Sequence, residues 1–171
     1  MPHRRPPIYL LDANVFMEAH RRYYAHDICP GFWECLVHYC RAARLMSIDR
    51  VRAEIADGDA LSAWVKHAPG SLFVSSGEGP VVEAFREMMT WVQANEQFLP
   101  GAKAEFARGA DGWLAAYAKV YGAVLVTHEV YSVGARRTVP LPNVCKQFGV
   151  SYQDTFKMLR GLEARFGWAA R

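Results

Sequence analysis

Hydrophobic and polar positions follow two patterns along the chain: short unbroken apolar runs, and longer segments with helical spacing. The strongest apolar runs are residues 8–11 (IYLL) and 123–127 (AVLVT), with weaker ones around Ser47 and Ile48 and at residues 71–74 (SLFV). An unbroken apolar run of this length is typical of a strand that is buried on both faces of a parallel sheet. We therefore predict strands at these four places.

Between the apolar runs lie segments whose hydrophobic residues recur every three or four positions, as in an amphipathic helix. One helix is predicted to begin near Asn14. A stronger one follows Pro30, and its buried face is expected to comprise Phe32, Trp33, Leu36, Val37, Cys40 and Leu45. Residues 51–58 (VRAEIADG) start a further helix, which resumes at residues 60–68 after a break near Gly58.

The second half of the chain is predicted to be mostly helical. Residues 83–97 form a long helix, Pro100 begins a shorter one, and a third begins at Asp111 and is stopped by Gly122. Two short helices follow the proline-containing turn at 140–142, the last one amphipathic through Phe156, Leu159, Leu162 and Phe166. Strands that alternate with helices indicate an α/β fold with a mainly parallel central sheet flanked by helices.

Composition limits the class of protein and its organisation. The 171 residues, 51% of them hydrophobic, suffice for one domain with a sizeable core, which we expect to span residues 1–171. No apolar run approaches the roughly 20 residues that cross a bilayer, so no membrane segment is expected. The four cysteines contain no CxxC pair, which favours reduced thiols and a cytoplasmic location.

Charge is distributed unevenly. Residues 131–171 contain seven Lys and Arg against two acids, Asp154 and Glu163, and so carry +5 within a total of +3. An acidic body with a basic C-terminal quarter suits a metal site beside a polyanion. A solvated helix face with a basic tail gives the same distribution, so charge alone does not decide between them.

Four acids occupy positions where a parallel sheet places its active site. Asp12 and Glu129 follow the two strongest strands, and Glu54 and Asp111 lie in the first turns of predicted helices. Taken singly, an acid at a helix N-terminus is explained by capping. Taken together, four such acids repel one another unless a cation neutralises them. Oxygen ligands without a matching Cys/His set indicate Mg²⁺ or Mn²⁺.

The segments that contain these acids resemble a known family. "YLLDANVF", "DRVRAEI", "ADGWLAAYA" and "VLVTHE" are similar, in this order, to the four signature segments of PIN-domain nucleases. "PGFWECL" and "VPLPNVCKQFGV" extend the resemblance to a branch of PIN-like bacterial proteins related to VapC-type toxins. One such motif is weak, whereas four in order over nearly the whole chain are specific.

The resemblance implies a PIN-like three-layer fold, and a catalytic and metal-binding role for the acids already identified: Asp12, Glu54, Asp111 and Glu129. It further implies that Asn14, Thr127 and His128 surround those ligands. Many PIN domains have Asp where this chain has Glu129, which leaves one and two metal ions both open. The chemistry implied is hydrolysis of RNA phosphodiester bonds, in a toxin held by a cognate antitoxin protein and forming a homodimer. We also assign Arg136 and Arg137, in the loop after Glu129, to RNA binding, and a solvated loop that happens to contain two arginines stays open as the alternative.

Alternative interpretations differ in how well they fit. A zinc site fails because Cys35 and His38 have no second pair with ligand spacing. A phosphotransferase of the haloacid dehalogenase type needs Asp-x-Asp, and Asn14 stands at the second position. A non-catalytic PIN-like module that binds RNA or a partner stays open, as does a nuclease that processes RNA without being a toxin.

Overall fold

A five-stranded sheet forms the centre of the molecule in the computed structural model, which describes residues 6–55 and 58–168. The strand order is β3-β2-β1-β4-β5, and each neighbouring pair is parallel. The strands are short: β1 (Tyr9–Leu11), β2 (Leu45–Ile48), β3 (Phe73–Val74), β4 (Val124–Val126) and β5 (Tyr152–Gln153). The predicted α/β fold is confirmed, and the sheet is entirely parallel.

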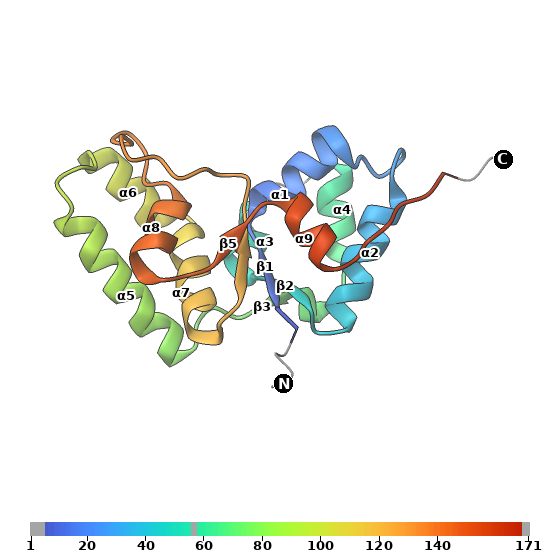
Figure 1. Cartoon of the computed structure of the whole chain (residues 1–171), viewed down its shortest axis with the longest axis horizontal. Coiled ribbons are helices and arrows are strands. Elements are labelled where there is room, and N and C mark those ends of the chain that lie inside the picture. Colours follow the sequence, from blue (N-terminus) through green and yellow to red (C-terminus); the bar gives the residue numbers. More distant parts are fainter. Residues whose placement is uncertain (1–5, 56–57, 169–171) are drawn as a thin grey trace.

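Helices cover both faces of this sheet, giving three layers (Figure 1). One side holds α5 (Gly79–Ala94), α6 (Pro100–Arg108), α7 (Asp111–Tyr121) and α8 (Leu141–Phe148). The other side holds α1 (Ala13–Glu18), α2 (Pro30–Arg41), α4 (Ala60–His67) and α9 (Thr155–Gly161). A short α3 (Asp49–Glu54) follows β2, a π-helical turn η1 (Ala19–Tyr23) extends α1, and a 3₁₀ turn η2 (Gly70–Leu72) precedes β3.

Helix α7 and strands β1 and β4 each contribute fully buried residues to the hydrophobic core. Leu11, Leu125 and Leu114 are each 0% exposed. The first turn of α7 can approach α5 and α6 only because residue 112 is glycine: a Cβ there would lie 2.9 Å from Phe85 and 3.1 Å from Phe106. This close packing determines where the neighbouring Asp111 lies.

Several helix boundaries differ from the prediction. Leu45 was expected on the buried face of the second helix, but α2 ends at Arg41 and Leu45 begins β2. Ala43 adopts a left-handed conformation (φ 54°) that turns the chain from helix to strand. A single leucine fits the helical period and the buried strand equally well, so periodicity could not separate the two. The long helix α5 also starts earlier than residue 83, because Pro80 stands in its first turn, where proline favours helix initiation. It ends at Ala94, before the predicted residue 97.

The C-terminal segment contains the strand that the sequence did not reveal. β5 is two residues long, too short for a period of two to be detected. The last helix ends at Gly161, so Leu162 and Phe166 were wrongly placed on it. Phe166 instead packs edge to face against Tyr24 and Phe32 from an extended segment.

The four cysteines are free thiols, in accord with the prediction. Within the described part of the chain, no helix is both long and apolar enough to cross a bilayer.

Candidate metal centre

Parallel pairing of β1 with β4 brings the first two acids to one edge of the sheet. Leu11 is in register with Val126, and the backbone N–H of Asp12 donates to the Val126 carbonyl over 3.0 Å. The residues that follow the two strands, Asp12 and Thr127, therefore lie side by side. Glu129 comes two residues later in the same turn.

A third acid reaches this edge from α7. Asp111 is the first residue of that helix. One carboxylate oxygen from each of Asp12, Asp111 and Glu129 lies within 4.8 Å of the others. Three acids from two strand ends and one helix start thus form a single group, as the sequence predicted for these three residues.

Glu54 lies next to this group but is not one of its members. Among the described residues, the set that meets the 4.8 Å distance comprises the three other acids only. Glu54 is the last residue of α3, whereas the sequence placed it in the first turn of a helix, and that prediction was wrong. Its Oε1 accepts the backbone N–H of Ala110 over 2.8 Å, which ties α3 to the start of α7. A metal-binding role for Glu54 stays a prediction.

Asp12 is buried and held by a hydrogen-bond network rather than by a helix cap. It occupies the N-cap position of α1, but its carboxylate makes no capping hydrogen bond. Instead Thr127 Oγ1 donates to Asp12 Oδ2 over 2.8 Å, and accepts from Asn14 Nδ2 over 3.2 Å and from the Glu129 backbone N–H over 3.1 Å. Asn14 and Thr127 therefore orient the carboxylate from behind, as expected for residues that support a metal ligand.

Asp111 is the least stabilised acid of the group. It starts α7 without capping it, since Ala110 occupies the N-cap position and no side-chain cap is made. Burial, followed by repulsion from Asp12, Glu129 and Glu54, raises the pKa of Asp111 to about 8. Burial also raises the pKa of Asp12 to about 6, against the lowering effect of the Thr127 hydrogen bond. Both carboxylates thus favour a neighbouring cation.

Residues that the sequence did not single out complete the back of the group. Glu129 Oε2 accepts the backbone N–H of Leu141 over 2.8 Å, at the N-terminus of α8, where the helix dipole favours a negative charge. Cys145, one turn further along α8, is buried, and burial together with the neighbouring Asp111 and Glu129 raises the pKa of its thiol to about 12. The prolines at the start of α8 could have indicated a helix N-terminus here, but nothing in the sequence indicated that Glu129 would bind to it.

His128 lies in the cleft but faces α9. Its backbone N–H donates to Asn14 Oδ1 over 3.1 Å, and its Nε2 lies 3.0 Å from Thr155 Oγ1. The structure therefore places His128 beside the acids as a neighbour, in accord with the sequence prediction, and links the site to the start of the last helix.

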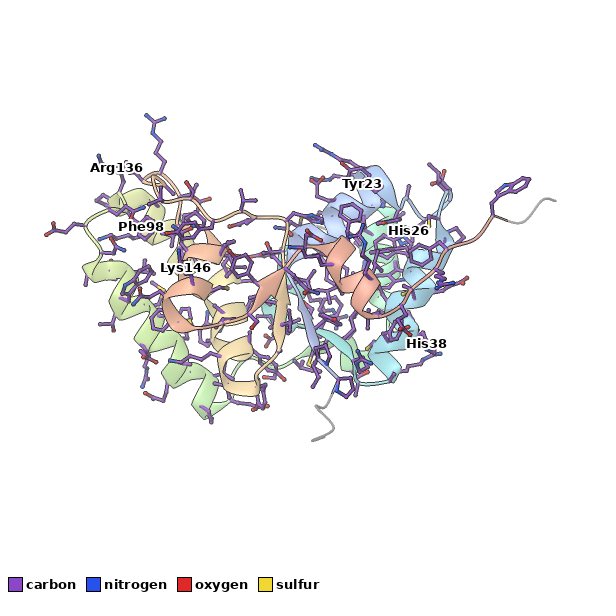
Figure 2. The ribbon with its side chains drawn as sticks, in the orientation of Figure 1. Tyr23, His26, His38, Phe98, Arg136 and Lys146 are labelled. Atoms are coloured by element: carbon purple, nitrogen blue, oxygen red, sulfur yellow. The ribbon has the colours of Figure 1, made fainter. Side chains whose placement is uncertain are left out.

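A cleft opens in front of the acids. It measures about 890 Å³, and its lining includes Asp111, Glu129, Glu54, Arg136 and Arg137. The two arginines lie in the loop between β4 and α8, both exposed, and the Arg136 carbonyl accepts the Leu99 N–H over 2.8 Å. In Figure 2 the Arg136 side chain extends from the upper side of the molecule, where the strands end. The cleft thus combines an acidic floor with basic residues along its rim.

The residues present suit a divalent cation. Three carboxylates offer hard oxygen ligands of the kind that Mg²⁺ and Mn²⁺ prefer, and no Lys or Arg in the described ranges forms an ion pair with them. The acidic group could therefore bind a metal. No second group of this kind is found among the described residues, which leaves Cys35 and His38 without partners for zinc.

Comparison with protein families identifies the chain over most of its length. Residues 9–166 match the model of a domain of unknown function, DUF4411. The chain belongs to the DUF4411 family. No curated protein sequence matches this DUF4411 chain.

Comparison with solved structures concerns the fold of the DUF4411 domain. A structure of VapBC2 from Rickettsia felis, bound to a DNA fragment from its promoter, aligns with a TM-score of 0.50 and 12% identity, over 86% of this chain and 98% of that one. A structure of FitAB bound to the IR36 DNA fragment aligns with a TM-score of 0.49 and 14% identity, over 86% and 94% of the two chains. The first alignment confirms that the DUF4411 domain has a PIN-like fold, as the sequence motifs predicted.

Proposed function

We propose that this protein is a Mg²⁺- or Mn²⁺-dependent endoribonuclease. The observation that carries the proposal is the convergence of Asp12, Asp111 and Glu129 within 4.8 Å at the carboxyl edge of a parallel sheet. Burial and mutual repulsion of acids without a cationic partner destabilise a protein, and a bound metal ion offsets this repulsion. The PIN-like fold and the order of the four motifs support the same function.

Each residue has a distinct task in this proposal. Asp12, Asp111 and Glu129 hold the metal, while Thr127 and Asn14 keep the Asp12 carboxylate oriented through the hydrogen bonds described above. A divalent metal held by these residues would supply positive charge beside the scissile phosphate and would lower the pKa of a water molecule, so that hydroxide is available as the nucleophile at neutral pH.

Glu54 and the two arginines act around these ligands. Glu54 holds the start of α7 through the Ala110 N–H and lines the cleft together with Asp111 and Glu129. Arg136 and Arg137 bind the phosphates that flank the bond being cleaved. Hydrolysis proceeds by direct attack of water on phosphorus, with no covalent link between enzyme and RNA.

The first test is cleavage of a labelled single-stranded RNA by the purified chain. Activity should require Mg²⁺ or Mn²⁺, disappear with a chelator, and be lost in Asp12→Asn. Glu105→Gln is the matched control, since it removes a negative charge that lines the same cleft and repels Asp111, at a residue outside the group of three acids. Equal activity in Asp12→Asn and the wild type would overturn the assignment of the site.

The biological setting is proposed with the enzyme activity. The motifs that resemble VapC-type toxins support this setting, and we propose that this chain is the toxin of a toxin–antitoxin pair, dimeric and bound by a cognate protein. Induction of the intact chain in bacteria should then arrest growth, and Asp12→Asn should relieve the arrest. A folded, active chain that leaves growth unchanged would favour an RNA-processing nuclease instead. A folded chain that binds RNA but never cleaves it would favour a non-catalytic module.

A further inference from the structure

Two exposed aromatic side chains meet on the surface beside the acidic site. Tyr23, the last residue of η1, is 60% exposed, and Phe156, in the first turn of α9, is 41% exposed. Their ring centroids lie 6.1 Å apart with an interplanar angle of 74°, so one ring meets the other edge to face. Single exposed aromatic residues are common, whereas two that meet from distant parts of the sequence form a defined surface.

This aromatic pair is connected to the acidic site from both sides. His128 lines the cleft, and its contact with Thr155 leads directly to Phe156. Tyr23 is reached along α1 and η1, which start immediately after Asp12, so it lies roughly 15 Å from that residue at the usual helical rise. Figure 2 shows Tyr23 and Arg136 on the same upper side of the molecule, on opposite sides of the sheet.

Three cationic residues neighbour the pair along η1 and α9. Lys157 and Arg160 are exposed on α9, and neither forms an ion pair with an acid among the described residues. Arg22, next to Tyr23, is 66% exposed and contacts Glu18 over 3.1 Å. Open aromatic rings beside cationic side chains are the combination that binds single-stranded nucleic acid, because bases stack on the rings while the cations attract the phosphates.

We propose that Tyr23 and Phe156 form a base-stacking subsite for single-stranded RNA, a few nucleotides from the bond that is cleaved. The proposal rests on the nuclease function proposed above. In it, the RNA crosses the carboxyl edge of the sheet, with its backbone on Arg136 and Arg137 on one side and a base stacked on the aromatic pair on the other. Since every base has a π face, the subsite contributes affinity and register with little sequence preference.

The experiment measures binding of a short single-stranded RNA containing 2-aminopurine to the catalytically inactive Asp12→Asn protein. Tyr23→Ala and Phe156→Leu should each weaken binding by about 5- to 100-fold and reduce the quenching of 2-aminopurine fluorescence. Phe156→Tyr retains an aromatic ring and should bind like the parent. Tyr121→Ala is the matched control: Tyr121 is 46% exposed and ends α7 just before β4 begins, so it lies at the amino edge of the sheet, opposite the edge that holds the acids.

Salt dependence separates stacking from charge. The aromatic variants should lower affinity at every salt concentration with the slope of log affinity against log salt unchanged, because stacking releases no counterions. Unchanged affinity in well-folded Tyr23→Ala and Phe156→Leu proteins would overturn the subsite. So would variants that bind RNA normally but lose self-association in gel filtration, since the surface would then be a protein interface.

Failure of the nuclease proposal gives a different result. A wild-type chain that cleaves no RNA, but whose RNA binding still depends on Tyr23 and Phe156, would overturn the enzyme activity and support the subsite. A chain that binds no RNA at all would overturn both.

Discussion

Two acids near the carboxyl edge of the sheet, Asp49 and Asp111, have opposite surroundings. Asp49 follows β2 as Asp12 follows β1, yet Asp49 Oδ1 accepts three hydrogen bonds, from the backbone N–H groups of Arg50 (2.9 Å) and Ser76 (3.2 Å) and from the Ser76 hydroxyl (2.7 Å). Arg50 lies beside it, with Nε donating to Ser76 Oγ over 3.1 Å and its guanidinium 3.8 Å from the centre of the Trp113 ring. One oxygen of the exposed Asp49 carboxylate is thus satisfied by hydrogen bonds from its own protein.

Asp111 has none of these partners. Burial and repulsion from four acids, Asp12, Glu129, Glu54 and Glu105, raise its pKa to about 8, where an ordinary aspartate lies at 3.8. The comparison shows that an acid at the carboxyl edge of a parallel sheet is not a site by position alone. Asp49 is exposed and its Oδ1 accepts three hydrogen bonds, whereas Asp111 lies half-buried among other acids and would gain more from a bound cation.

The largest expected difference between the two regions is catalytic. Asp111→Asn should reduce metal-dependent RNA cleavage by roughly 100-fold or more, because the acid that lacks other partners is the one committed to the metal. Asp49→Asn should retain most of the activity, since its carboxylate serves only the β2–β3 edge. Glu54→Gln should also abolish cleavage if its free oxygen takes part. Initial rates with Mg²⁺ and Mn²⁺ measure all three, and equal losses for Asp49 and Asp111 would remove the distinction.

The second difference concerns the stability of the metal-free protein. Because the native pKa values of Asp12 and Asp111 lie above the usual 3.8, the native state holds more protons than the unfolded state between about pH 4 and pH 8. The contribution of these groups is therefore fully present below pH 4 and is lost as pH rises through 6 and then 8. Added Mn²⁺ should restore stability at pH 8.

Asp111→Asn removes the larger of these two effects. At pH 8 it should stabilise the metal-free protein by on the order of 3 kcal/mol, since each unit of pKa shift corresponds to about 1.4 kcal/mol and the acids share the repulsion. Urea unfolding at pH 5 and pH 8 measures the effect. A wild type whose stability is the same at both pH values would contradict the account of the acid group.

Asp49 should respond in the opposite direction. Asp49→Ala leaves the buried Ser76 hydroxyl and N–H without their acceptor and should destabilise the protein by about 1 to 3 kcal/mol at neutral pH. The same unfolding assay gives the value. Stabilisation by Asp49→Ala would mean that Asp49 is also under repulsion and that the two regions do not differ.

The smallest expected effect is at the rim of the cleft. Arg136→Ala/Arg137→Ala should weaken RNA binding by the inactive Asp12→Asn protein without changing its affinity for Mn²⁺. Loss of two phosphate contacts should reduce the slope of log affinity against log salt by roughly 1.4, at about 0.7 per contact on a single strand. An unchanged slope would show that the two arginines do not touch the RNA backbone, and Lys146 and Lys157 would be the next residues to replace.

Much of the fold could be predicted because local patterns and tertiary packing agree in it. The runs at residues 8–11 and 123–127 are apolar on both faces, so they can only be central strands. Gly122 ends α7 in a left-handed conformation (φ 65°), as its position after the helix predicted. Where one residue satisfied two patterns, as Leu45 did, or where a strand was as short as β5, the sequence was ambiguous.

The sequence by itself determined that Asp12 and Glu129 follow strands and that Asp111 starts a helix, although it misplaced Glu54, and motif order was sufficient to predict that Asp12, Asp111 and Glu129 lie together. Only the tertiary structure decided which acids are satisfied. Ser76 donates hydrogen bonds to Asp49 from 27 residues along the chain, and the Leu141 N–H donates to Glu129 from 12 residues along the chain. Hydrogen-bond partners and burial depend on the packing of such segments, and so does the pKa of an acid. The sequence was therefore sufficient to predict an acidic site, but not to predict which carboxylates the protein satisfies by its own hydrogen bonds and which are candidate metal ligands.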